Sequence, residues 1–484
     1  MRKVIMKSKK IATALTVLMT LSNLHAAAQE VEVDATTGAT QQVSKTEKMT
    51  NALSRLHIGG YGEAVMTRNF YSQSFNRYKK PENYKDDASH GRFALPHVCL
   101  NLGYDFGKGW TLGSEIEFEH GGNGTAVEIE AEEAGEYEAE VEKGGEVNIE
   151  QFWINKAFLD GQLNVKAGEI IVPVGYSNAH HEPNQFFTVY RPEGEATIMP
   201  NTWHQLGLSV WGKVKNWRYE AQFLSGLNSE SFTAENFVHY GATSPYEFKV
   251  ANSYAGAARI DYYAGGAAAR SGANPRLVPQ APWLRVGLSG YYGYTFRNTL
   301  RTPGAKYDDV TGALAIVAAD FTLNRWNWIV RGNVDYAHFS DADEISAYNQ
   351  ANWTHHKYQD GNPHHYSNIG SHAVAYAVEA GYNIFSQIPR LKDEKFYVFG
   401  RFEHYNTMAS GTYKEMYKYT KKYRCAFGVN YQPVKQLTIK GEYSYRFFEK
   451  PDNNGLASDS PLYKQPYNNE PSVSIGVTYT GWFL

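Results

Sequence analysis

Cysteine is scarce in this chain: only Cys99 and Cys425 occur among 484 residues. Two cysteines allow one bridge at most, so a disulfide framework cannot hold the fold together. Lysine and arginine are not in excess either, with 47 against 50 acidic residues, so the chain offers no basic patch to a nucleic-acid partner. Beyond the N-terminal segment, long apolar runs are also missing. Because a membrane-spanning helix needs about 20 apolar residues, helical membrane spans are excluded.

The N-terminal segment holds the one short apolar run. Residues 1–10 carry five basic and no acidic side chains, residues 11–24 are mainly apolar, and 26–28 are three alanines. These are the three parts of a cleaved secretory signal peptide, and the apolar part is too short to anchor the chain in a membrane. We therefore predict a signal peptide over 1–28, followed by a polar periplasmic segment over 29–55.

Acidity is concentrated in one segment of the mature chain. Without the five basic residues of the signal peptide, 42 Lys and Arg face 50 Asp and Glu, and residues 128–146 hold nine of these Glu and one Lys. The rest of the mature chain is therefore balanced. We interpret 128–146 as a solvated external loop. The alternative is divalent-cation binding, for which its oxygen ligands are suitable but lack the spacing of a known loop template.

The chain is rich in aromatic residues and glycine, with 36 Tyr, 24 Phe, 10 Trp and 43 Gly. In LTIKGEYSYRF (437–447), the residues Leu, Ile, Tyr and Phe alternate with Thr, Lys, Glu, Ser and Arg. Such alternation is typical of a strand with two unlike faces. Most of the expected strands are about 10 residues long, enough for a tilted strand to cross a bilayer. The sixteen segments are 56–66, 97–106, 110–119, 148–158, 163–172, 202–212, 217–225, 254–263, 283–293, 312–321, 327–338, 372–384, 395–405, 422–432, 437–448 and 472–484.

The connections between these segments alternate between short and long. Short ones such as 107–109 and 159–162 are followed by long polar ones such as 120–147 and 173–201, and 264–282 is the exception. Outer-membrane barrels show this pattern of tight periplasmic turns and long external loops. The sequence therefore predicts an all-β fold after the N-terminal segment, a transmembrane antiparallel β-barrel of about 16 strands over 56–484.

Energetics decide which face of the strands meets lipid. A Lys or Arg on the lipid side at mid-bilayer costs about 2–4 kcal/mol. Three of them facing outward, for example Arg331, Lys440 and Arg446, would cost as much as the whole stability of a typical domain, about 5–15 kcal/mol. The charged face must therefore line a polar interior, and a barrel of this size is wide enough to leave an aqueous channel.

Charged residues on the inward parity are the candidates for the pore lining. They are Arg218, Arg259, Arg285, Arg331, Arg424, Lys440 and Arg446 on the basic side, and Glu115, Glu117, Glu119, Glu220, Asp335 and Glu442 on the acidic side. Opposed charges can set the selectivity of a pore through a transverse field. The alternative is that they form internal salt bridges that fill the wall, and the sequence leaves both open.

The segment 165–212 carries a more specific pattern. A strand ends in Gly168, the tripeptide Pro-Val-Gly (173–175) follows, and a long loop rich in aromatics and prolines runs to Trp203 before a strand that contains Gly207–Gly212. This pattern resembles the phosphate-selective porin (O and P) family of Gram-negative outer membranes. The strand count and the alternating loop lengths extend the resemblance loosely over the whole predicted barrel.

The resemblance implies a porin in the outer membrane of a Gram-negative bacterium, which passes small hydrophilic solutes, anionic ones among them, by passive diffusion. It also implies a homotrimer in contact with outer-membrane lipid and lipopolysaccharide, without cofactor or enzymatic activity. The third external loop, 173–201, would fold into the lumen as a constriction. The polar candidates in that loop are His180, His181, Glu182, Arg191, Glu193 and Glu195.

Two other functions stay open at this point. An outer-membrane enzyme would need a serine, a histidine and an acid close together in space, which no motif supports. A surface all-β glycan-binding protein would have irregular connections in place of the alternation. The histidine pairs 355–356 and 364–365 could hold a metal only if their loop folds back, so no metal site is assigned.

Overall fold

A computed structural model describes residues 29–33, 40–44, 53–72, 77, 90–119, 124–125, 128–129, 139–140, 143–144, 147–200, 202–228, 232, 234, 236–238, 253–265, 283–296, 312–353, 368–391, 393–410, 418–448 and 468–483. The chain divides into two units, 1–57 and 58–484. In the first unit, β1 (Gln29–Val33) and β2 (Thr40–Ser44) form an antiparallel hairpin. The expected signal peptide and the histidine pairs lie outside the described residues, as does most of the acidic segment.

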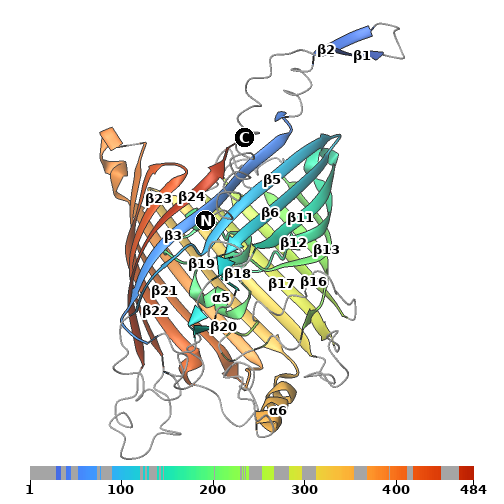
Figure 1. Ribbon diagram of the computed structural model, residues 1–484. Helices are drawn as coiled ribbons and strands as arrows, with labels where there is room; N and C mark the ends of the chain where they lie inside the picture. The colour runs from blue at the N-terminus through green and yellow to red at the C-terminus, as the bar shows by residue number, and fades with distance from the viewer. Residues whose placement is uncertain are drawn as a thin grey trace, which may run out of the picture. The chain divides into compact units, whose positions relative to one another are not determined.

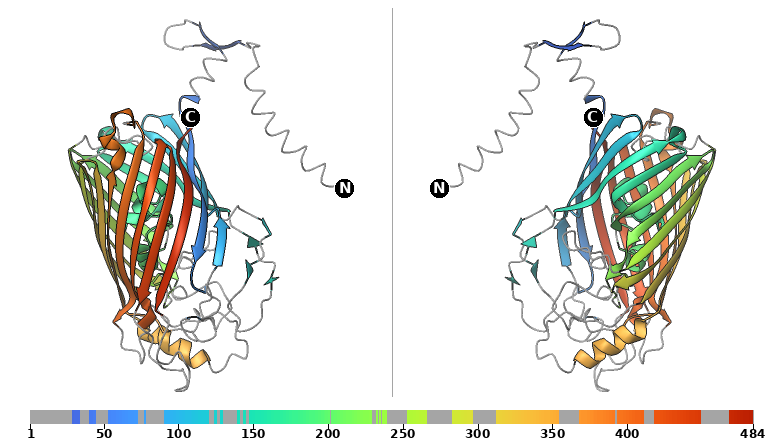
Figure 2. Two further views of the ribbon diagram at one scale, coloured as in Figure 1. Left: turned by 90° about the vertical axis from the view of Figure 1, so that its left-hand side faces the viewer. Right: turned by 90° about the vertical axis from the view of Figure 1, so that its right-hand side faces the viewer.

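Sixteen long strands of the described residues form one closed antiparallel barrel (Figures 1 and 2). They are β3 (Leu56–Asn69), β5 (His97–Gly107), β6 (Trp110–Glu119), β11 (Val147–Phe158), β12 (Leu163–Ile171), β13 (His204–Val214), β14 (Trp217–Ser225), β16 (Tyr254–Ala264), β17 (Leu284–Phe296), β18 (Ala313–Arg325), β19 (Trp328–Phe339), β20 (His372–Asn383), β21 (Lys395–Ser410), β22 (Lys421–Val434), β23 (Leu437–Phe448) and β24 (Asn469–Trp482). The last strand pairs with the first, from Ser472 opposite Asn69 to Trp482 opposite Gly59, and this pairing closes the ring.

The other elements are short and belong to the connections. The strands among them are β4 (His90–Ala94), β7 (Gly124–Thr125), β8 (Glu128–Ile129), β9 (Ala139–Glu140), β10 (Lys143–Gly144) and β15 (Leu227–Asn228). The helices are η2 (Leu159–Gly161), α4 (Tyr176–Ala179), η3 (Pro183–Gln185), α5 (Glu193–Ile198), α6 (Ala342–Trp353), η8 (Ile384–Gln387), η9 (Pro389–Leu391) and η10 (Lys418–Thr420). Within the described part of the chain, no helix is both long enough and apolar enough to cross a membrane.

All sixteen expected strand segments are confirmed, and most of their ends agree to within three residues. The largest differences are at β18 and β21, which extend to Arg325 and Ser410. Both strands continue because their backbones remain paired, Arg325 with Trp328 and Ser410 with His372. The prediction of an all-β antiparallel barrel is therefore confirmed, and backbone pairing extends some strands beyond the apolar pattern.

The two faces of the strands carry opposite kinds of side chain. On β23, Ile439 is exposed on the outside, whereas Lys440 and Glu442 are buried on the inside. On β19, Val334 is 59% exposed and Arg331 only 8%. The apolar face of these strands thus points away from the barrel interior and the charged face points into it, as the cost of a charge in lipid requires.

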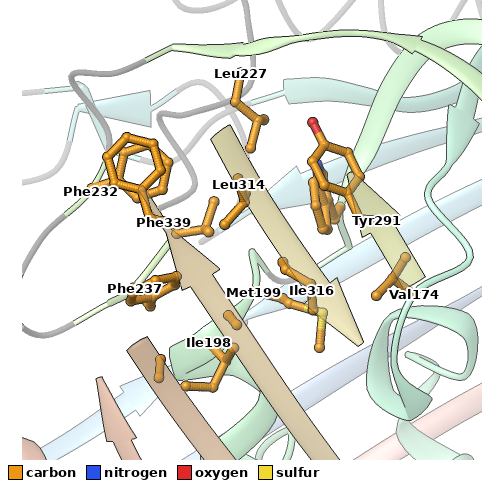
Figure 3. Close-up of a cluster of buried hydrophobic side chains, with 14 of the residues drawn as sticks. Val174, Ile198, Met199, Leu227, Phe232, Phe237, Tyr291, Leu314, Ile316 and Phe339 are labelled. Atoms are coloured by element: carbon orange, nitrogen blue, oxygen red, sulfur yellow. The ribbon is translucent and has the colours of Figure 1, made fainter. Parts of the chain in front are cut away.

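One sector of the interior is apolar, which corrects the expectation of a polar lumen. Ala257, Ile316 and Ala375 of β16, β18 and β20 are buried in one cluster with the loop residues Ile198 and Met199. In Figure 3 the side chain of Met199 lies close to that of Ile316. Because the loop covers this wall, the wall needs no polar side chains there, and burial of apolar surface stabilises the contact.

A second loop contributes to the same apolar cluster. The ring of Phe232 stacks on that of Phe339 with 4.1 Å between the ring centroids (Figure 3). The backbone N–H of Phe237 donates to the carbonyl oxygen of Thr197 at 2.8 Å. Phe232 and Phe237, which follow β15 in the chain, therefore pack against this cluster and support α5, a contact that the sequence did not predict.

Candidate functional site

The connection between β12 and β13 lies inside the barrel, as the position of α5 within the ring of strands shows (Figures 1 and 2). Helix α5 packs against β20 and β21, α4 against β18, and η3 against β24. The segment predicted as the constriction, 173–201, thus crosses the interior and touches several strands of the wall.

A turn at Gly175 sets the course of this loop. Gly175 has a φ of +77°, a left-handed conformation that favours glycine, and a Cβ at this position would overlap the carboxylate of Glu195. The same carboxylate accepts hydrogen bonds from the backbone N–H groups of Tyr176 and Ser177 and from the Ser177 hydroxyl. Burial raises the pKa of Glu195, and these hydrogen bonds act against the rise. Residue 195 of α5 therefore caps α4 and folds the loop onto itself.

One buried lysine of the wall holds the middle of the loop. Lys440 donates to the carbonyl oxygens of Pro183, Phe186 and Thr188 at 2.5, 3.1 and 2.8 Å. Its ammonium also lies 4.3 Å from the centroid of the Phe186 ring. Since an ammonium has three N–H donors, these three carbonyls satisfy it. Lys440 was predicted to line the pore, and the structure places it as an anchor of the loop.

Carboxylates of the wall hold backbone N–H groups of the same loop. Glu442 accepts from the N–H of Val189, and Glu403 accepts from the N–H of Gly194, each at 2.8 Å. Both carboxylates are buried. A buried backbone N–H without a partner destabilises the fold by about 1–3 kcal/mol. These two hydrogen bonds therefore help to hold the loop in its position.

A row of alternating charges runs along β19 to β24, and we call it the arginine ladder. Its members in order of contact are Arg331, Glu379, Arg401, Glu403, Arg424, Glu193, Arg446, Glu470 and Arg77, with Glu442 as a further partner of Arg424. Five arginines thus face five carboxylates. The row includes three of the predicted pore-lining arginines, and each of them has a carboxylate partner.

Glu193 is the member of the arginine ladder that comes from the loop. Its carboxylate lies 3.0 Å from Arg446 and 3.4 Å from Arg424, and the Tyr405 hydroxyl donates to it at 2.7 Å. Burial alone would raise the pKa of Glu193, but Arg446 and Arg424 outweigh it and lower the pKa to about 2. The carboxylate therefore stays ionised at neutral pH and ties α5 to the wall.

A second charged cluster lies on β16 to β18. Arg259 contacts Asp261 and Asp320 at 2.7 and 2.9 Å, and Arg285 contacts the same two carboxylates at 3.2 and 2.5 Å. Arg259 also donates to the carbonyl oxygen of Gly175 at 2.8 Å. Two guanidinium groups and two carboxylates compensate each other here. This is the arrangement expected if inward charges form internal salt bridges within the wall.

The wall made by β5, β6 and β11 has a different character, and we call its buried carboxylates Glu115, Glu117 and Glu150 the acidic wall. His181 of the loop faces it, with Nε2 at 3.7 Å from Oε1 of Glu115. Cys99 lies in the same region with its thiol 3.8 Å from Glu117. Cys99 and Cys425 are both free, so the single bridge that the sequence allowed is not formed.

Arg191 of the loop is the cation whose charge acts on the acidic wall. Burial alone would lower the pKa of Arg191, but Tyr61 and the carboxylates of Glu150 and Glu117 outweigh it and raise the pKa. The guanidinium donates to the Thr202 hydroxyl at 2.6 Å. Among the described residues it forms no direct ion pair with the acidic wall.

Two of the remaining predicted residues border these clusters: Arg218 contacts Asp261 of the second charged cluster, and Glu119 lies beside Glu117 of the acidic wall. His180 stacks on Tyr176 with 4.8 Å between the ring centroids, and burial, reinforced by nearby arginines, lowers its pKa. Glu182 is buried, and Glu119 is half-buried at the end of β6. Arg218 is half-buried and lies 3.5 Å from Asp261.

The sequence missed several members of the charged clusters. They are Glu150, Asp261, Asp320, Glu379, Arg401, Glu403 and Glu470. Most of these residues share the inward parity of strands that were correctly located, so that parity was the signal that could have found them. Glu150 is different, because it occupies a β-bulge, where the alternation of faces is broken.

Comparisons with known proteins give the following findings. No family model matches the chain. An uncharacterised protein of Aquifex aeolicus (strain VF5) is 25% identical over 406 residues, which cover 82% of this chain and 77% of that protein.

Several solved structures are similar to the barrel. OprB of Pseudomonas putida at high pH has a TM-score of 0.48 and 10% identity, and the match covers 90% of this chain and 96% of that chain. An anion-selective porin from Comamonas acidovorans has a TM-score of 0.46, 11% identity and coverages of 88% and 99%. OmpT, an outer membrane protein of Vibrio cholerae in trimer form, has a TM-score of 0.46, 10% identity and coverages of 88% and 100%.

Proposed function

We propose that this protein is an outer-membrane porin that passes small hydrophilic solutes by passive diffusion. The observation that carries the proposal is the closed barrel of sixteen strands with apolar side chains outside and ionic side chains inside. Such a barrel satisfies all backbone hydrogen bonds between strands, which is what lipid demands of a spanning sheet. Its outer surface suits hydrocarbon and its charged walls suit water.

The loop inside the barrel would set the size of the solute. It carries Glu193 on α5 and is tied to the wall through Lys440, so the narrow part is built from a fixed segment. Passive diffusion through such a channel needs no energy source. Size exclusion by a docked loop, which packs against an apolar sector of the wall and beside the charged clusters, is the mechanism that we assign to the proposed channel.

Ion selectivity is expected to be weak, because the arginines of both charged clusters are compensated by carboxylates. The arginine ladder holds equal numbers of arginines and carboxylates, and so does the cluster of Arg259, Arg285, Asp261 and Asp320. An anion preference, which the resemblance implies, would require uncompensated cations in the narrow part. We therefore propose passage of small neutral and zwitterionic solutes ahead of anions.

Conductance in planar lipid bilayers tests the proposal. The full mature chain, folded in detergent, is expected to give discrete single-channel steps and a reversal potential close to zero in a KCl gradient. Folded protein that inserts into the bilayer without any conductance would overturn the channel function. A strongly anion-selective or cation-selective reversal potential would overturn only the weak selectivity. The proposed homotrimer is tested separately by native mass spectrometry of the detergent-solubilised protein, where monomers alone would contradict it.

A further inference from the structure

A buried group of metal-ligand side chains lies between the acidic wall and the loop. The ligand atoms of Glu115, Glu150 and His181 all lie within 4.8 Å of one another, and all three residues are buried. A second set, Cys99, Glu117 and Glu150, meets the same criterion and shares Glu150. These residues come from β5, β6, β11 and the loop, so the group joins three wall strands to the segment inside the barrel.

Glu150 reaches this place through a β-bulge. The pairing of β11 with β6 shifts between Ile149, which is opposite Ile116, and Gln151, which is opposite Glu115. Glu150 is the extra residue of the bulge and has no residue opposite it on β6. Its side chain is turned inward and is 2% exposed. A bulge commonly re-aims one side chain at the expense of regular pairing. Here the re-aimed side chain is a carboxylate pointing at other carboxylates.

Neither carboxylate oxygen of Glu150 has a hydrogen-bond donor among the described residues. Burial of an ionised carboxylate without hydrogen bonds or a counter-ion is among the most costly arrangements in a protein. Arg191 donates to Thr202 and forms no ion pair with Glu150 in the described part of the chain. Among the described residues no cation therefore contacts Glu150 directly, although the charge of Arg191 acts on it from further away.

His181 supplies an independent observation. Its Nδ1 lies 3.1 Å from the carbonyl oxygen of Asn178. A carbonyl oxygen can only accept, so Nδ1 must carry the proton, and in the neutral ring Nε2 is then a lone pair. That Nε2 is buried, has no hydrogen-bond partner among the residues that the structure describes and lies 3.7 Å from Oε1 of Glu115. Metal-binding histidines are oriented in this way, with the second ring nitrogen donating to a carbonyl or carboxylate.

We propose that Glu115, Glu150 and His181 bind one divalent transition-metal ion, of which Zn²⁺ is the representative. An imidazole with two carboxylates suits Zn²⁺ and its neighbours better than Mg²⁺ or Ca²⁺, which prefer oxygen ligands alone. Glu117 and Cys99 lie beside the ion as a further carboxylate and a thiol. The bound ion neutralises the buried carboxylates and ties the loop to β6 and β11. This site does not depend on the channel function.

Zinc binding by the full mature chain tests the proposal. Protein folded in detergent is stripped with EDTA, equilibrated with Zn²⁺ and separated from free metal, and its metal content is measured by mass spectrometry and its affinity by calorimetry. The wild type is expected to hold one Zn²⁺ per chain. Glu150→Gln and His181→Ala are each expected to weaken binding by more than the 10–100-fold that loss of an outer partner of a metal ligand costs.

His180→Ala is the matched control, because this neighbouring histidine stacks on Tyr176 and lies outside the cluster. It is expected to bind zinc like the wild type. Heat-modified mobility in gel electrophoresis confirms that each variant is a folded barrel. If a variant fails to fold, the thermal midpoint of the wild type decides, since Zn²⁺ must raise it relative to EDTA. A wild type without stoichiometric zinc, or equal loss in His180→Ala and His181→Ala, would overturn the site.

Discussion

The arginine ladder and the acidic wall lie in the same barrel, but their buried carboxylates differ in whether they contact an arginine. In the arginine ladder each carboxylate touches an arginine, for example Glu379 with Arg331 at 2.5 Å and with Arg401 at 3.3 Å. In the acidic wall Glu150 is buried, and in the described part of the chain no donor reaches either of its carboxylate oxygens. Every carboxylate of the arginine ladder thus has an arginine partner, whereas Glu150 of the acidic wall has no direct cationic partner among the described residues.

Strand register is the reason for this difference. In the arginine ladder the register places Glu379 directly opposite Arg331 on one side and Arg401 on the other. In the acidic wall the register places Glu117 opposite Cys99 and Glu115 opposite Asn101. Opposite charges stabilise a cross-strand pair, whereas a carboxylate facing a neutral group gains little. The position of a charged residue on the inward face of a strand therefore does not show whether it forms a salt bridge within the wall or is available to a ligand.

The largest effect is expected when Lys440, which anchors the loop to the wall, is replaced. In Lys440→Met, three loop carbonyls lose their donor, each at about 1–3 kcal/mol, so we expect loop docking to weaken by at least about 3 kcal/mol. Single-channel conductance should rise and become noisy, and the loop should become sensitive to protease. Lys395→Met, at an exposed position of β21, is the matched control. Unchanged conductance in Lys440→Met would mean that this loop does not limit flow.

Charged substitutions on the outer face of the barrel test whether this face lies in lipid. Val334→Arg places a charge on the exposed middle of β19 and should lower the free energy of unfolding in lipid by about 2–4 kcal/mol. Val434→Arg, near the turn after β22, should cost about 0–1 kcal/mol because it is close to the interface. Urea titration of the barrel in phospholipid vesicles measures both. Equal, small effects would mean that the outer face of β19 is not in lipid.

A smaller effect, on ion selectivity, is expected when an arginine of the arginine ladder is removed and its carboxylate partners lose a counter-charge. Arg446→Ala leaves Glu193 and Glu470 with one arginine fewer. A unit charge about 4 Å from an ion in water changes its energy by about 1 kcal/mol, which corresponds to about fivefold in a permeability ratio. Reversal potentials in a KCl gradient should therefore shift towards cations, while Arg390→Ala in the exposed turn should change nothing. No shift would mean that Arg446 lies outside the ion path.

Acid is also expected to weaken the docking of the loop, through Glu193. Its pKa is about 2 in the folded protein and about 4.3 in an unfolded chain, so its contribution to loop docking is fully present above pH 4.3 and is lost as the pH falls towards 2. Conductance of the wild type should rise over this window. Glu193→Gln should remove the step, and Asp393→Asn, in an exposed turn, should retain it. An unchanged step in Glu193→Gln would assign it to another carboxylate.

The fold was predictable because its signal is local. The two-residue period located all sixteen strands, and the cost of a charge in lipid decided which face of β19 and β23 points inward. The candidate site was predictable only in part. The loop 173–201, which we predicted to be a constriction, was expected inside the barrel. The apolar cluster around Met199 and the contact of Phe232 depend on how residues from two connections pack together.

Glu150 shows where local reasoning ends. Ile149 and Phe152 are both exposed on the outside although they are three positions apart, a break in parity that the sequence displays and that a bulge explains. The sequence by itself determined the barrel and the side of the sheet on which charges lie, because alternation and solvation act residue by residue. Only the tertiary structure decided which charges meet, because strand register and loop docking bring together residues hundreds of positions apart.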